Sequence, residues 1–257
     1  MMLSKNKVSE ITALHQKKRR QSAGLFIVEG EKMVDELLAS TWQIVDLFAT
    51  ADLFEKYHAL DKRVQLADSH LFSKISTLKT PAGILAIAKQ AANDFSFEDI
   101  KNKFTLCLDG LRDPGNLGTI IRIADWFGIS TIVCSEDTVD VYNSKTIQAT
   151  MGSFMRVNVV YTPLVPFLIN AKAQDLPLFG AVLNGENVYN KKGITKGIIV
   201  MGSESHGLSA HVLACIDEPI TIPSKLLQLS SLAEQGQSID SLNVAIATSV
   251  ICAVFAK

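Results

Sequence analysis

The stretch that decides the fold is Leu106 to Ser130, LCLDGLRDPGNLGTIIRIADWFGIS. A short apolar run ends at Asp109, a turn rich in Asp, Pro, Gly and Asn follows, and apolar residues then recur at helical spacing. Small residues crowd this turn, where they allow backbone or a ligand to approach closely. The pattern predicts a strand, a functional loop and a helix. An ordinary strand-turn-helix unit with a solvated Arg122 is the alternative interpretation.

The length and composition of the chain are typical of a globular protein with two domains. The chain has 257 residues, of which 47% are hydrophobic, so it can form two moderate cores, and two domains are expected. No apolar run approaches the roughly 18 residues of a membrane span, and the first residues lack the apolar segment of a signal peptide. We therefore expect a cytoplasmic protein with no membrane partner. The four cysteines are far apart in apolar surroundings, which predicts reduced buried thiols and no metal site.

The net charge of −1 excludes a uniformly basic nucleic-acid-binding protein, but the charge is uneven along the chain. Residues 1–23 contain six Lys or Arg residues and one Glu, which gives six minus one, or +5. The run Lys17, Lys18, Arg19 and Arg20 predicts a contact with phosphates. A solvated helix face is the alternative.

The N-terminal part predicts a compact α/β domain over residues 1–95. We expect helices at residues 7–20, 31–40, 51–60 and from Asp68, which is a predicted N-cap. Strands are expected at residues 25–28, 42–50, 64–67 and 83–89. The polar stretch 91–103 then breaks the alternation, and we assign residues 96–103 as a linker.

The C-terminal part, residues 104–257, repeats the alternation with longer apolar strands. Candidate strands are residues 104–109, 130–135, 156–162, 178–184, 197–202 and 218–223. Helices are expected to begin near Gly115, Asn143, Pro163 and Ser209, and a final helix to run from Ser241 to Phe255. Strands that are apolar at consecutive positions are buried on both faces, so the pattern predicts a mostly parallel sheet covered by helices. Ligands bind beyond the carboxyl ends of such strands.

Three loops follow strand ends and carry polar or small residues. The first is residues 109–118, DGLRDPGNLG, and the second is residues 201–209, MGSESHGLS. The third runs from Ile222-Pro223 to Ser241-Leu242-Asn243.

Together these loops resemble the three motifs of the SpoU-type RNA 2′-O-ribose methyltransferases of the SPOUT class. The first motif is matched by Asp113-Pro114, Asn116, Gly118, Arg122, Ala124 and Phe127-Gly128. The second is matched by Gly202, Glu204, Gly207 and Leu208, and the third by Ile222-Pro223 and Ser241-Leu242-Asn243-Val244. The resemblance covers residues 104–257, and the N-terminal part, with its FIVEG stretch at residues 26–30, resembles the smaller substrate-binding domain of many members.

The resemblance implies a fold, an activity and partners. It implies a deep trefoil knot in the C-terminal domain and methyl transfer from S-adenosylmethionine to a ribose 2′-OH of ribosomal or transfer RNA. It also implies a homodimer and no metal. In the third motif, 17 residues (224–240) separate Pro223 from Ser241, whereas members commonly have a much shorter spacer with a glycine four residues before the serine, where this chain has Gln237.

The resemblance also implies roles for individual residues. Arg122 faces the 2′-OH, and Asn116, Glu204, Ser241 and Asn243 shape the reaction site. The implied cofactor-binding residues are Leu183, Asn184, Met201, Gly202, Glu204, Ile222, Pro223, Ser241 and Leu242. The predicted RNA-binding residues are Lys17, Lys18, Arg19, Arg20 and Arg112. Because a guanidinium is a very weak acid that keeps its proton, we favour Arg122 holding phosphate and polarising the hydroxyl over Arg122 acting as a base, and the sequence leaves both schemes open.

Other functions agree less well with the sequence. Ser205-His206 beside Glu204 could suggest a hydrolase, but the spacing Gly-x-x-Ser-x-Gly differs from that of a nucleophile elbow. No Gly-x-Gly-x-x-Gly run follows the first strand, so a dinucleotide-binding oxidoreductase is disfavoured. The stronger alternative is a non-catalytic RNA-binding protein that keeps the fold, which the altered third loop would favour.

Overall fold

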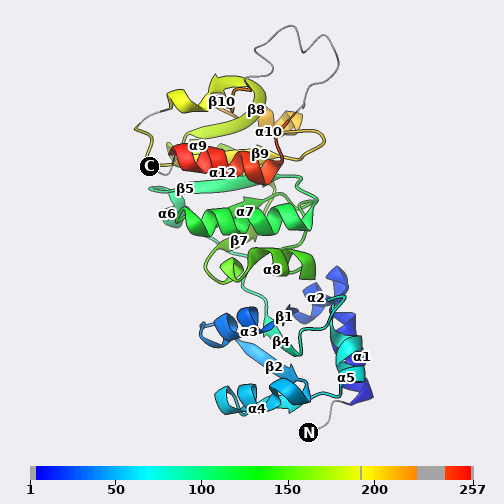
Figure 1. The fold of residues 1–257 in the computed structure, drawn as a ribbon. Coiled ribbons are helices and arrows are strands. Elements are labelled where there is room, and N and C mark those ends of the chain that lie inside the picture. The colour runs from blue at the N-terminus through cyan, green and yellow to red at the C-terminus, as the bar shows by residue number, and fades with distance from the viewer. Residues whose placement is uncertain (1–3, 192, 225–240, 256–257) are drawn as a thin grey trace. The chain divides into compact units, whose positions relative to one another are not determined.

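The computed structural model describes residues 4–191, 193–224 and 241–255 (Figure 1). Contacts divide the chain into two compact units. The N-terminal unit comprises residues 1–92 and 140–155, and the C-terminal unit comprises residues 93–139 and 156–257. Residues 140–155, which follow two strands of the C-terminal sheet in sequence, therefore group with the N-terminal unit.

The N-terminal unit contains a four-stranded sheet with the order β1-β4-β2-β3. Its strands are β1 (Leu25–Glu29), β2 (Ile44–Ala49), β3 (Val64–Leu66) and β4 (Ile84–Lys89). Strand β4 pairs antiparallel with β1 and β2, and β3 pairs parallel with β2. The four predicted strands are confirmed. Residues 84–88 of β4 are buried, as expected for a strand between two others with both faces covered.

Seven helical segments accompany this sheet within the described part of the unit. They are α1 (Lys5–Ala13), α2 (Lys17–Ala23), α3 (Glu31–Leu38), α4 (Ala51–Leu60), α5 (Ser69–Ile75), α8 (Ser144–Thr150) and the 3-10 helix η1 (Ser153–Met155). The prediction of Asp68 as an N-cap is confirmed, because its side chain accepts a hydrogen bond from the His70 N–H. The prediction of one helix over residues 7–20 is wrong: the chain leaves helical geometry at residues 14–16 and restarts at Lys17.

The C-terminal unit contains a six-stranded sheet with the order β10-β8-β9-β5-β6-β7. Its strands are β5 (Phe104–Asp109), β6 (Thr131–Cys134), β7 (Asn158–Tyr161), β8 (Leu178–Asn187), β9 (Gly197–Gly202) and β10 (Glu218–Thr221). Every adjacent pair is parallel. The structure therefore confirms the six predicted strands and the parallel arrangement.

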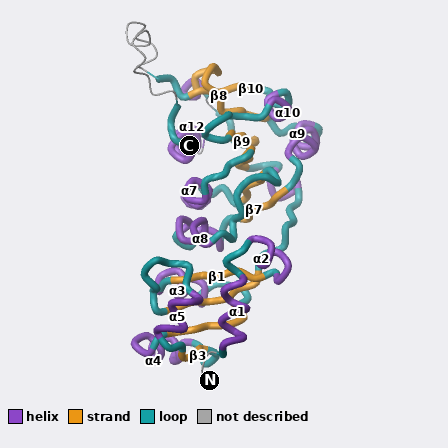
Figure 2. The backbone as a smooth tube through the Cα atoms, turned by 90° about the vertical axis from the view of Figure 1, so that its right-hand side faces the viewer, coloured by secondary structure: helices purple, strands orange, loops and turns teal. Residues whose placement is uncertain are grey.

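Helices cover both faces of the C-terminal sheet (Figure 2). Helices α7 (Pro114–Trp126) and α12 (Val244–Phe255) pack side by side on one face, and α9 (Leu164–Lys172) and α10 (Ala210–Leu213) lie on the other. A buried apolar cluster joins α9 and α10 to alternate residues of the strands, such as Cys107, Ile198 and Val200. The unit also contains the short helix α6 (Phe97–Ile100) and the 3-10 helix η2 (Val188–Asn190).

The stretch assigned as a linker holds α6. Ser96 and Asp99 form a capping box at its start, and Ile100 is buried in the C-terminal core. Phe95 and Phe97 pack against the same core through Phe167. Polar residues alternate with these apolar ones, so the local composition resembles that of a linker and does not indicate the helix.

The cysteine prediction is confirmed, since Cys107, Cys134, Cys215 and Cys252 are free and buried. Burial raises the pKa of the Cys252 thiol to about 12 and raises that of Cys107 well above its usual value. Within the described ranges, no group of three or more His, Cys, Asp or Glu residues could hold a metal ion. None of the helices described is long and apolar enough to cross a membrane.

Candidate active site

The candidate site lies where the strand order of the C-terminal sheet reverses direction. From β5 the chain continues to β6 and β7 on one side, whereas β8, β9 and β10 lie on the other. Strands β5 and β9 are parallel neighbours, and Asp109 pairs with Gly202 at their carboxyl ends. The first and second loops therefore leave the sheet side by side, at the position where open parallel sheets bind ligands.

Hydrogen bonds at both ends fix the first loop. Asp109 is buried and accepts a hydrogen bond of 2.7 Å from the backbone N–H of Ser209, which ties the end of β5 to the exit of the second loop. The backbone N–H of Gly110 donates to Ser135 Oγ at 2.8 Å. Asp113 caps α7 by accepting from the N–H of Asn116 at 2.7 Å, and Pro114 is the first helical residue. Asn116 is thereby held in the first turn of α7.

The second loop is a closed turn that presents Glu204. Ser203 and Gly207 exchange two backbone hydrogen bonds, of 3.0 and 2.9 Å. Gly207 has a φ of +67°, which favours glycine. A Cβ atom on Gly202 would lie 2.1 Å from the carbonyl carbon of Gly207, so the close approach of the two backbones requires glycine there. Glu204 lies in this turn and is exposed.

Three predicted residues from the three loops form one hydrogen-bonded chain. Asn243 Nδ2 donates to Asn116 Oδ1 at 3.0 Å, and Asn116 Nδ2 donates to the Glu204 carboxylate. Asn243 also starts α12, because its Oδ1 accepts from the N–H groups of Ala245 and Ile246 at 3.0 and 3.3 Å. One side chain therefore both begins the final helix and joins the polar chain.

The middle of the neighbouring strand, β8, lies outside the ladder of the sheet. Strand β8 pairs with β9 only over residues 178–180, and with β10 only through residues 179–180 and 186–187. Residues 181–185, which include the predicted Leu183 and Asn184, thus have no ladder partner among the described strands. Thr221 Oγ1 donates to the Leu183 carbonyl at 3.0 Å, and a Cβ on Gly185 would lie 2.7 Å from the carbonyl carbon of Ile220. A side-chain hydrogen bond and a close backbone approach, and not ladder pairs, therefore hold the middle of β8 against β10.

The remaining predicted site residues differ in exposure. Met201 is buried, so it can offer a ligand only its backbone, whereas Ile222 and Pro223 are half-buried. Arg122 is exposed on α7, and no hydrogen bond or ion pair joins it to any described residue. Ser241 and Leu242 are also exposed. Apart from Ser224, the long spacer 224–240 lies outside the described residues.

The predicted RNA-binding residues also separate into two kinds. Lys17, Lys18, Arg19 and Arg112 are exposed. Arg20 is not available to RNA: it is 4% exposed, and its Nη2 and Nε donate to Asp140 at 2.6 and 3.1 Å. Its Nη1 donates to two carbonyl groups at the break between α1 and α2. The assignment of Arg20 to RNA is therefore wrong, because helix rotation turns this member of the basic run inward.

Sequence reasoning missed the residues that support the first loop. Besides Asp109, Ser135 holds the Gly110 N–H and contacts Asp137 and Thr138 at 2.6 and 2.9 Å. The sequence does contain one signal for Asp109, because it is the only carboxylate in an otherwise mostly apolar strand. A carboxylate that ends a buried strand needs a hydrogen-bond donor from the protein.

Comparison with known proteins identifies the chain. Residues 103–253 match the SpoU rRNA Methylase family. The chain belongs to this family. Residues 5–86 match an MRM3-like substrate binding domain. The predicted resemblance is therefore confirmed for both parts of the chain.

Relatives of this SpoU methylase match it along nearly its whole length. A curated relative, the 23S rRNA (guanosine(2553)-2′-O)-methyltransferase RlmP of Bacillus subtilis, is 29% identical over 95% of this chain and 94% of its own. A solved structure of a TrmH-family protein from Porphyromonas gingivalis has a TM-score of 0.85 at 34% identity, covering 99% and 98% of the two chains. An AdoMet-bound rRNA methyltransferase from Sinorhizobium meliloti has a TM-score of 0.84 at 28% identity, covering 99% and 96%.

Proposed function

We propose that this protein transfers a methyl group from S-adenosylmethionine to a ribose 2′-OH of ribosomal RNA. The observation that carries the proposal is the hydrogen-bonded chain from Asn243 through Asn116 to Glu204, which joins all three motifs at the switch point of the sheet. Ribosomal rather than transfer RNA is favoured because the relative RlmP, aligned over nearly the whole chain, is named for a 23S rRNA nucleotide. A non-catalytic RNA-binding protein would have no need to keep this polar chain intact.

The residues at the switch point fit S-adenosylmethionine. Residues 181–185 of β8 lie outside the strand ladder, and the glycines at 185 and 202 let β8 and the second loop pack closely against neighbouring backbone. We propose that this cradle, continued by Ile222, Pro223, Ser241 and Leu242, holds the cofactor. The bound cofactor supplies a methyl group activated by a positively charged sulfur. Glu204 gives the site a carboxylate that suits a cationic ligand.

Arg122 is the proposed partner of the reacting hydroxyl. Its guanidinium is exposed on the first helix of the site and free of carboxylate partners among the described residues, so it can hold the phosphate beside the target ribose. Since a guanidinium stays protonated, Arg122 polarises the hydroxyl, and the proton leaves to phosphate or water as the oxygen acquires the methyl group. Alignment of the nucleophile supplies most of the acceleration.

The two parts of the chain have different proposed roles. Residues 104–257 form the methyltransferase domain, in which we propose the trefoil knot that the family resemblance implies. Residues 1–95 bind the RNA substrate, and exposed Lys17, Lys18 and Arg19 contact phosphates together with Arg112. Residues 96–103, predicted as a linker, hold α6 and pack into the core of the C-terminal unit. The proposed location is the cytoplasm, because the relative RlmP is a bacterial rRNA enzyme.

We also propose a homodimer. Helix α12 buries Val244, Ala245, Ile251 and Cys252 yet leaves Ile246 56% exposed, so it is apolar on more than one side. The adjacent α7 ends in Trp126, which is 85% exposed. Because Asn116 and Asn243 join the starts of the two helices, Ile246 and Trp126 lie at opposite ends of this helix pair, and each exposed apolar side chain suits contact with a second copy. Light scattering at micromolar concentration should give twice the chain mass, and a monomer would contradict the proposal.

Two measurements test the activity. Calorimetry without added metal should detect S-adenosylmethionine binding, and no heat at millimolar cofactor would contradict the enzyme assignment. Mass spectrometry of ribosomal RNA nucleosides and fragments from cells with and without the gene should show one 2′-O-methylated nucleotide that depends on the gene. The same comparison on transfer RNA would reveal a different substrate class.

A further inference from the structure

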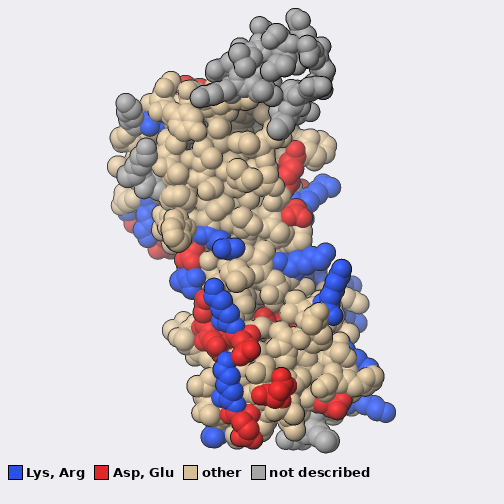
Figure 3. Space-filling view, in the orientation of Figure 1, with Lys and Arg blue, Asp and Glu red and all other residues tan. Residues whose placement is uncertain are grey.

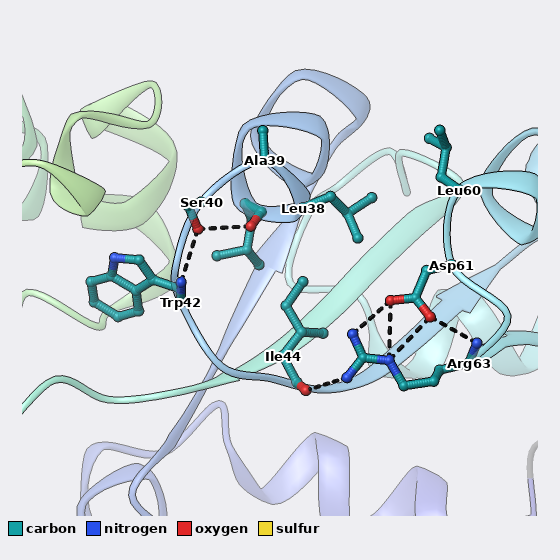
Figure 4. A pocket seen from close by; sticks show the side chains of 9 residues that line it. Leu38, Ala39, Ser40, Trp42, Ile44, Leu60, Asp61 and Arg63 are labelled. Carbon is teal, nitrogen blue, oxygen red and sulfur yellow. Dashed lines mark hydrogen bonds and ion pairs between the residues drawn. The ribbon is translucent and has the colours of Figure 1, made fainter.

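A cavity of about 450 Å³ in the N-terminal unit has no role in the reaction described above (Figure 4). It opens between the end of α3 and the segment that follows α4. Its lining residues are Leu37, Leu38, Ala39, Ser40, Trp42, Ile44, Leu60, Asp61 and Arg63. This volume is within the usual range for small-ligand pockets.

Hydrogen bonds hold the walls of the cavity in place. Ser40 Oγ donates to the Leu37 carbonyl at 2.7 Å and accepts from the Trp42 N–H at 3.1 Å, which fixes the turn after α3. On the opposite wall, Arg63 Nε and Nη2 donate to Asp61 at 3.0 and 2.6 Å. Arg63 Nη1 donates to the Ile44 carbonyl at 2.9 Å. A ligand would therefore meet a preformed wall and lose little free energy to ordering it.

The cavity combines a flat charged pair with apolar side chains. The Arg63 guanidinium and the Asp61 carboxylate form an ion pair, and Figure 4 shows this pair across the cavity from Leu38 and next to Ile44. Leu60, also on this rim, is 63% exposed. Guanidinium planes and apolar side chains are surfaces on which unstacked RNA bases pack. This composition suits a flat ligand with a polar edge.

The charges favour a nucleobase over a phosphate. Helices α3 and α4 both direct their carboxyl ends to the cavity rim, and helix C-termini carry partial negative charge and unpaired carbonyl groups. Arg63 already directs Nε, Nη1 and Nη2 to Asp61 and Ile44, and its pKa is raised by the carboxylate. An anion would meet repulsion there, whereas an exocyclic amino group could donate to a carbonyl at one of these helix ends.

We propose that this cavity binds an unpaired, amino-bearing nucleobase of the RNA substrate, outside the nucleotide that is methylated. This inference rests on the proposed function, because it takes RNA as the ligand. The base stacks on the Arg63 guanidinium, which Asp61 holds in place, and its amino group points to the carbonyls at the ends of α3 and α4.

The first experiment uses the two tryptophans of the chain as paired reporters. Trp42 lines the cavity, whereas Trp126 is on α7 of the other unit. In NMR titrations of the full chain, millimolar adenosine or cytidine should shift the backbone N–H of Trp42, which donates to Ser40 Oγ in the cavity wall, and leave the backbone N–H of Trp126 unchanged. Uridine, which lacks an amino group, should shift it less. A shift with inorganic phosphate and none with nucleosides would overturn the assignment, as would no shift with any probe.

The second experiment compares two matched arginines. Arg63→Ala removes the flat wall, whereas Arg156→Ala removes a similarly exposed bidentate pair, with Asp125, from the C-terminal unit. RNA affinity should fall roughly tenfold in Arg63→Ala, the scale of losing one stacked base, and little in Arg156→Ala. Leu38→Trp, which fills the cavity without removing a charge, should reproduce the loss at unchanged cofactor affinity.

Equal RNA affinity in wild type, Arg63→Ala and Leu38→Trp would overturn the inference. Methylation by the wild-type protein is measured on the same RNA, so failure of the proposed function would show separately as absence of transfer. A loss confined to Arg63→Ala, with Leu38→Trp unaffected, would assign Arg63 to a phosphate contact and also reject the base pocket.

Discussion

The two units of this molecule differ in where their charged residues lie, and on the face drawn in Figure 3 charged side chains are denser over the N-terminal unit than over the C-terminal unit. In the mixed sheet of the N-terminal unit, charged side chains are buried beside the strands, as Arg20 and Glu29 show at 4% and 1% exposure. In the parallel sheet of the C-terminal unit, Glu204 and Arg122 lie exposed in the loops and helix beyond one edge. Parallel strands end at a common edge, so their loops can gather into a site, whereas the mixed sheet distributes its strand ends over two edges.

The buried charges of the N-terminal unit join distant segments. Glu29 accepts hydrogen bonds from the Thr77 N–H at 2.8 Å and from the hydroxyls of Ser76 and Thr77. It thereby ties the end of β1 to the loop before β4. Arg20 ties the start of the chain to Asp140, 120 residues away. Removing the partner of a buried charge lowers the free energy of unfolding. We therefore assign these residues to the stability of the fold and not to ligand binding.

The largest effect is expected from Arg20→Ala. Removal of one member of a buried ion pair leaves the Asp140 carboxylate uncompensated and should cost about 3–5 kcal/mol of unfolding free energy. Lys18→Ala, two residues earlier and exposed, should change stability by less than about 0.5 kcal/mol. Urea denaturation of both variants measures the difference. Equal stabilities would mean that the pair has no structural role.

The next largest effect is expected from Arg122→Ala, which should reduce the reaction rate without changing stability. Arg122→Ala should leave cofactor affinity and unfolding free energy nearly unchanged, while single-turnover methyl transfer falls by at least about 100-fold. Arg122→Lys should recover little, because an ammonium cannot reproduce a two-pronged grip on phosphate and hydroxyl. Rates are measured on the true RNA, with cofactor affinity measured alongside. A wild-type rate in Arg122→Ala would reject the assignment.

Most of the secondary structure could be predicted from the sequence, because strand signals are local. Runs such as residues 104–109 and 197–202 are apolar at consecutive positions and proved to be buried parallel strands. Arg20 could not be separated from Lys17, Lys18 and Arg19 by composition. Only the break at residues 14–16 sets which of the four side chains turns inward. Its partner, Asp140, lies in a segment with no local signal of this contact.

The candidate site was harder to predict than the strands. Asn116 is 88 residues from Glu204 and 127 from Asn243, so no local pattern brings these three residues together. Their grouping came from the resemblance to a family, and the strand order supplies its physical reason. The roles of Arg122, Ser241 and Leu242 stay predictions.

A smaller effect is expected at the exposed part of the basic run. The triple variant Lys17→Ala, Lys18→Ala, Arg19→Ala should weaken RNA binding about tenfold at low salt and lower the salt dependence of the affinity, since fewer counterions are released. Its unfolding free energy should stay close to that of wild type, in contrast with Arg20→Ala. Filter binding at several salt concentrations measures the RNA affinity and its salt dependence. An unchanged salt slope would assign these residues to solvation only.

The smallest effect separates the two roles of Asn243 within one side chain. Its Oδ1 caps α12, and its Nδ2 donates to Asn116. Asn243→Ala removes both contacts and should cost about 1 kcal/mol of stability, the usual value of an N-cap. Asn243→Asp keeps a capping oxygen, loses the donor and adds a negative charge that a helix N-terminus tolerates, so its thermal midpoint should stay near that of wild type. Both variants should lose methyl transfer if the chain to Glu204 matters for the reaction, and full activity in Asn243→Asp would show that the contact with Asn116 serves the helix start alone.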